Sequence, residues 1–72
     1  MITAKEALAI GKTIVAGMNR EAARHDAGSS EWVAARGAAL NIIDDLWYDV
    51  LPLKVRETIG SRDYFLVACG WE

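Results

Sequence analysis

The 72 residues are enough for one domain and no more, because compact domains are rarely much shorter than about 50 residues. Hydrophobic residues make up 53% of the chain, charged residues make up 25%, and the formal net charge is −2. This composition excludes a disordered chain, and it argues against a protein whose main task is to coat nucleic acid. The single cysteine excludes an intramolecular disulfide, and the single histidine excludes the common zinc-binding spacings.

The compartment that the sequence suggests is the cytoplasm, without contact with a membrane. Residues 1–19 carry Lys5, Glu6 and Lys12 inside their apolar stretch, which is not the pattern of a secretory signal. No apolar run approaches the roughly 18 residues that a membrane-spanning helix needs. An unpaired cysteine also fits a reducing compartment.

The first predicted helix covers about residues 4–25. Residues 3–6 match the S/T-x-x-E capping box, in which a hydroxyl and a carboxylate each satisfy a free backbone N–H. Apolar residues then recur with helical spacing, which predicts an amphipathic helix. Gly28 suits a left-handed residue at the helix end, and the next N-cap is expected at Ser29 or Ser30.

The second predicted helix runs from Glu31 to about Val50, and its apolar residues are unusually widespread. On a helical wheel they cover roughly half of the circumference, whereas a surface helix needs an apolar stripe of about 100° against one partner. One antiparallel helix would leave part of this face uncovered. We therefore expect the C-terminal segment or a second subunit to pack against the same helix.

The C-terminal part of the chain is predicted to form short helices. Pro52 interrupts the second helix and can start a new one over Leu53–Ile59, which Gly60 would end. Ser61 begins a further N-cap region, and residues 64–69 are predicted to be helical, although their aromatic and β-branched content also suits a strand.

The predicted fold class is therefore all-α, in a single domain of residues 1–72. It consists of an antiparallel helical hairpin of about residues 4–25 and 31–50, with short C-terminal helical segments, and it is expected to pack as a dimeric helical bundle.

The residues that could support catalysis have simpler interpretations. The triplet Gly11, Lys12 and Thr13 ends like a phosphate-binding loop, but Glu6 occupies the position where that motif requires glycine, and the triplet lies inside a predicted helix. His25 suits a helix C-terminus. Cys69 lies in an apolar run, which favours a buried and unreactive thiol. We expect no enzyme activity, no cofactor and no metal.

An acidic cluster on the second helix is a candidate surface for a basic partner. It consists of Asp44, Asp45 and Asp49. With a turn centred near Gly28, residues whose numbers sum to about 56 lie side by side, so that Lys12 lies near Asp44. The alternative interpretation is therefore charge complementarity between the two helices, worth about 0.2–1 kcal/mol for each exposed pair.

Arg36 is the unusual charge, because it falls inside the apolar face of the second helix. A buried arginine needs a carboxylate or carbonyl partner, and Glu21 is the nearest candidate in the hairpin, either in the same chain or across a dimer. Alternatively, Arg36 lies at the edge, with its stem on Trp47 and its head in water. Arginine and tryptophan are enriched in binding hot spots, so Arg36 is also a candidate interface residue.

The C-terminal aromatic residues are candidates for contact with another protein. Tyr64, Phe65 and Trp71 carry more apolar surface than a free tail would, and Trp71 either closes the bundle or faces a partner. Together with Trp47, they complete the set of predicted partner-binding residues.

The function expected from these features is that of a small protein–protein interaction module. It would act as a homodimer and would regulate or inhibit another protein, and its size suggests a phage or mobile-element factor that acts on a host protein. The alternative is a dimeric regulator that binds nucleic acid or a small anion through Arg20, Arg24 and His25, although this basic group is small for phosphate binding.

Overall fold

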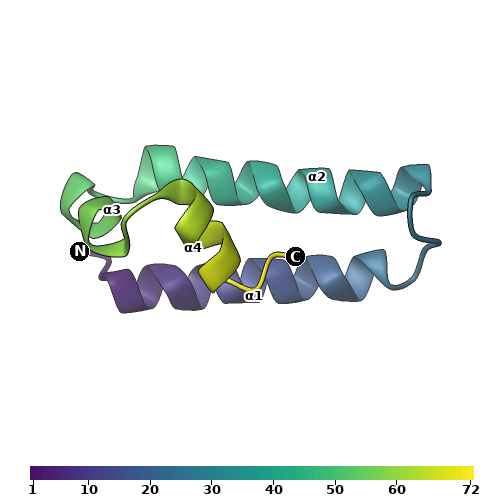
Figure 1. Cartoon of the computed structure of the whole chain (residues 1–72), viewed down its shortest axis with the longest axis horizontal. Coiled ribbons are helices and arrows are strands. Elements are labelled where there is room, and N and C mark those ends of the chain that lie inside the picture. The colour runs from purple at the N-terminus through teal and green to yellow at the C-terminus, as the bar shows by residue number, and fades with distance from the viewer.

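The computed structural model describes residues 1–72, and every regular element in it is a helix. The elements are α1 (Ala4–Ala22), α2 (Ser30–Asp45), the π-helical turn η1 (Leu46–Val50), α3 (Leu53–Ile59) and α4 (Arg62–Ala68). The all-α prediction is confirmed, and residues 64–69 are helical rather than extended. α1 and α2 lie side by side in opposite directions, in a molecule of 39 × 18 × 16 Å (Figure 1). None of the helices combines the length and the apolar character needed to cross a membrane.

Three helices begin at the hydroxyl residues that the sequence suggested. At the start of α1, the Glu6 N–H donates to Thr3 Oγ1 and the Thr3 N–H donates to Glu6 Oε1, both at 3.1 Å. The side chain of Ser29 accepts a hydrogen bond from the Trp32 N–H at the start of α2. The side chain of Ser61 accepts one from the Tyr64 N–H at the start of α4. These side chains satisfy backbone N–H groups that have no partner inside the helix.

The two long helices end differently from the prediction. α1 stops at Ala22, three residues before the predicted end, and the chain turns through Gly28, whose φ of 85° favours glycine. α2 continues into η1, where the N–H of Leu51 donates to the carbonyl of Leu46 at 2.9 Å. Pro52 follows and has no N–H with which to continue the helix. The wider π-helical turn was not predicted from the sequence.

The core lies where α4 crosses the seam between α1 and α2. Phe65 of α4 is fully buried and packs on Trp47 with ring centroids 5.3 Å apart. On the α1 side, a Cβ at Gly11 would collide with Sγ of Cys69, so the absence of a side chain at Gly11 lets α4 approach closely. This contact shows that Gly11 serves close helix packing. α4 lies on one face of the α1–α2 pair only, and the opposite face is not covered by it (Figure 1).

Candidate functional site

The C-terminal residues close over α2 at Arg36. The guanidinium carbon of Arg36 lies 4.8 Å from the ring centroid of Trp32 and 4.5 Å from that of Trp71. Its Nη2 donates a hydrogen bond of 2.7 Å to the carbonyl oxygen of Glu72. We call these four residues the C-terminal clasp. The arginine is thus satisfied by two aromatic faces and one carbonyl.

Local structure explains how the clasp forms. Trp32 and Arg36 are four residues apart on α2, so they share one face of the helix. After α4, Gly70 adopts a φ of 99°, and the Trp71 N–H donates to the Leu66 carbonyl at 3.2 Å. This turn ends α4 and leads the chain back towards α2. The clasp therefore depends on both the α2 spacing and the glycine turn.

The predicted surroundings of Arg36 are wrong in two respects. Within one chain, Glu21 does not pair with Arg36 and instead pairs with Arg24 at 3.2 Å and with His25 at 3.5 Å. Nor does the stem of Arg36 lie on Trp47, which packs against α4 in the core.

The predicted aromatic residues divide between the core and the surface. Trp47 is 5% exposed and Phe65 is 0% exposed, so in this conformation neither offers its ring to another molecule. Tyr64 is 62% exposed, and Trp71 is partly buried in the clasp. Val67 is also exposed and was missed, although its spacing of three residues from Tyr64 places both on the outer side of α4.

The predicted acidic cluster is only partly free. Asp44 accepts a hydrogen bond of 2.7 Å from Nε of Arg62, which also pairs with Asp63 at 3.2 Å. These hydrogen bonds raise the pKa of Arg62. The expected proximity of Asp44 to Lys12 gives no ion pair, and Asp44 instead fixes the start of α4. Its neighbours, Asp45 and Asp49, are exposed.

The basic group at the end of α1 is partly neutralised. Arg20 is exposed, but Arg24 and His25 both pair with Glu21. Hydrogen bonds to Arg24 and then to His25 lower the pKa of Glu21, which keeps this carboxylate charged. The internal carboxylate reduces the positive charge available to an anion.

No group of three or more His, Cys, Asp or Glu side chains is placed to hold a metal ion. Cys69 is buried as predicted, and burial raises the pKa of its thiol, which disfavours the reactive thiolate.

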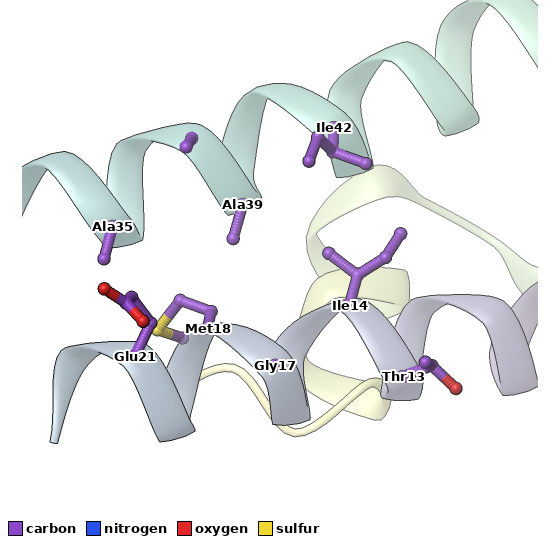
Figure 2. Close-up of a pocket in the computed structure, with 9 residues that line it drawn as sticks. Thr13, Ile14, Gly17, Met18, Glu21, Ala35, Ala39 and Ile42 are labelled. Carbon is purple, nitrogen blue, oxygen red and sulfur yellow. The ribbon is translucent and has the colours of Figure 1, made fainter. Parts of the chain in front are cut away.

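An open groove lies between α1 and α2, on the face away from α4 (Figure 2). Its volume is about 330 Å³. Figure 2 shows Ile14 across from Ile42, and Glu21 across from Ala35, which is the register expected for a turn near Gly28. We call this feature the α1–α2 groove.

Comparison with known proteins does not identify the function, because the sequence matches no protein family, no characterised protein and no solved structure. The candidate sites are therefore the two surfaces that the geometry defines. One is the C-terminal clasp with the outer side of α4, and the other is the α1–α2 groove on the opposite face.

Proposed function

We propose that this chain is a small protein–protein interaction module that regulates or inhibits a partner by occupying part of the partner's surface. The observation that carries the proposal is the C-terminal clasp, in which the guanidinium of Arg36 contacts the rings of both Trp32 and Trp71. Tryptophan and arginine are the residue types most enriched in binding hot spots. Because the ring is already held in place, little side-chain entropy is lost when a partner binds.

The surface beside the clasp supports the same function. Tyr64 and Val67 expose most of their side chains on the outer side of α4, three residues apart, and Trp71 follows after the turn at Gly70. Grouped exposed apolar residues on a small protein are typical of association surfaces. The partner that suits this face is a protein with a complementary apolar surface. Its binding requires no cofactor and no catalytic step.

The proposed working form is a homodimer in which two α1–α2 hairpins make a four-helix bundle. A chain of this size has a small core, and several large apolar side chains stay exposed in the monomer. Association of two copies would remove part of this surface from water, which is favourable by about 25 cal/mol for each Å² of apolar area.

The test is affinity capture from the cells that produce the protein. The wild-type chain is expected to capture one dominant protein, and Trp71→Ala and Tyr64→Ala are expected to weaken its capture by about tenfold or more. Tyr48→Ala is the matched control, because Tyr48 is equally exposed but lies twelve residues, or about 18 Å of helix, beyond Arg36.

Circular dichroism must show that each variant keeps its helices. If the folded Trp71 and Tyr64 variants capture the protein as well as the wild type does, the assigned surface is wrong. If Tyr48→Ala alone loses capture, the binding surface lies around η1. Absence of any specific captured protein would contradict the interaction function itself.

A further inference from the structure

The wall that α2 contributes to the α1–α2 groove is apolar in its middle. Ala35, Ala38 and Ile42 line the groove from this helix, and their spacing of three and four residues places them on one helical face. Ile42 is 52% exposed and stands opposite Ile14 of α1 (Figure 2). An occupant of the groove must therefore offer apolar side chains to this wall.

Both ends of the same helical face carry carboxylates. Glu31 lies four residues before Ala35, near the start of α2. At the other end, Asp45 and Asp49 follow Ile42 by three and seven residues, so they continue its face along α2 and η1. All three acidic residues are exposed, and none of the ion pairs within the chain includes them.

Two basic residues near the groove lie on α1. Nη2 of Arg20 is 3.7 Å from the position that a Cβ would take at Gly17, which lines the groove. Arg24 is paired with Glu21. The single basic residue of α2, Arg36, is held in the C-terminal clasp. The α2 side of the groove is therefore acidic and has no base of its own to neutralise it.

We propose that the groove binds a helix of a partner protein, with the apolar residues of that helix in the groove and its lysine or arginine residues along α2. The inference rests on the proposed interaction function and adds a second contact surface, on the face away from α4. A pair of antiparallel helices offers a groove into which the side chains of a third helix can pack.

The three carboxylates distinguish between possible occupants. A basic flank on the bound helix offers each of them an ion pair, whereas an acidic flank would be repelled. A second copy of this chain would bring three further unpaired carboxylates to the same face. The charge of the groove edge therefore favours a basic partner over both alternatives.

The positions of the carboxylates set the length of the bound helix. Asp45 lies fourteen residues after Glu31, which corresponds to about 21 Å along the helix axis. A helix that pairs with both ends needs about four turns. Its basic residues should lie near both ends, with apolar residues between them.

The experiment uses two synthetic helical peptides that differ only in the sign of their charge. Both carry leucine at the positions that face the groove, and the flank toward α2 carries lysine in one peptide and glutamate in the other. Fluorescence anisotropy measures their binding to the full chain. The wild type is expected to bind the lysine peptide about tenfold more tightly than the glutamate peptide, and added salt should reduce this difference.

Charge-reversal variants test which side of the groove selects the peptide. Asp45→Lys combined with Asp49→Lys is expected to reverse the preference between the peptides. Asp63→Lys is the matched control, because it makes the same change of charge on α4, at a side chain that is 87% exposed. Ile42→Ala should weaken binding of both peptides, since both place leucine in the groove. Circular dichroism must show that each variant keeps its helices.

Equal binding of the two peptides by the wild type would overturn the inference, as would no binding of either at about 1 mM, a concentration that detects even a weak complex. A wild-type mass of twice 7.9 kDa that falls to 7.9 kDa in folded Ile42→Glu would also overturn it, because a second copy would then occupy the groove. Capture through Trp71 and Tyr64 is measured separately, so failure of the groove site and failure of the proposed function are distinguishable.

Discussion

Replacement of Gly11 by alanine tests whether α4 packs against α1 in the described position. A Cβ at Gly11 would collide with Sγ of Cys69 and would lie 3.2 Å from Cζ of Phe65. Both neighbours are buried in the core, so they have little room to move aside. Overpacking of this kind costs about 1–3 kcal/mol, whereas glycine to alanine in a helix interior gains about 1 kcal/mol.

The net expectation for Gly11→Ala is a loss of up to about 2 kcal/mol in the free energy of unfolding. In a domain of this size each kcal/mol corresponds to about 4–8 °C in Tm, so the loss is measurable by thermal and urea unfolding followed by circular dichroism. Gly37→Ala is the matched control, because Gly37 lies inside α2 and a Cβ added there would have no atom within 4 Å. It should raise the Tm.

The variant Cys69→Ala makes the test specific to one contact. It removes Sγ and leaves the Cβ of residue 69 at 3.4 Å from the new methyl group, which is close to ordinary contact. Cys69→Ala should therefore cost less stability in the Gly11→Ala background than in the wild type, and a double-mutant cycle measures this difference. The proposed packing would be refuted if Gly11→Ala stabilised the protein as Gly37→Ala does.

Three further predictions concern the clasp and the helix starts. Arg36→Ala should lower the free energy of unfolding by about 1–2 kcal/mol, because it removes two cation–π contacts, and the indole N–H resonance of Trp71 should shift. Ser29→Ala should cost about 1 kcal/mol in urea unfolding through loss of the α2 cap. Hydrogen bonds to the side chain and then the backbone of Thr3 lower the pKa of Glu6 in the folded state below its ordinary value of 4.5. The Glu6 carboxylate therefore contributes to the stability of the folded state above pH 4.5, and this contribution is lost as the pH falls through the folded pKa. The variant Glu6→Gln lacks this carboxylate, so it should lose less stability in an acid titration.

Local signals explain why the helices could be predicted from the sequence. Each helix cap joins two residues that lie only three positions apart, so the sequence alone contains the whole interaction. The capping residues are Thr3 with Glu6, Ser29 and Ser61. Pro52 acts in the same local way, because it stops a helix through its own ring and its missing N–H.

Contacts between distant residues explain what the sequence did not predict. Arg36 and Glu72 are 36 positions apart, and the turn that brings them together depends on Gly70 and on the depth to which α4 settles against Gly11. Hydrophobic spacing predicts which residues turn inward, but it gives neither the height nor the angle at which a short helix crosses a longer one. The hairpin register alone therefore predicts Glu21, the nearest carboxylate, as the partner of Arg36.

The broad apolar face of the second helix connects the sequence to the two surfaces. Ile42 and Ile43 have the same side chain, yet Ile43 is 0% exposed and Ile42 is 52% exposed. Successive helical positions differ by 100°, so Ile43 points into the core that α1 and α4 share, whereas Ile42 points away from α4. α4 thus covers one part of the broad face, and no segment of residues 1–72 covers the part around Ile42.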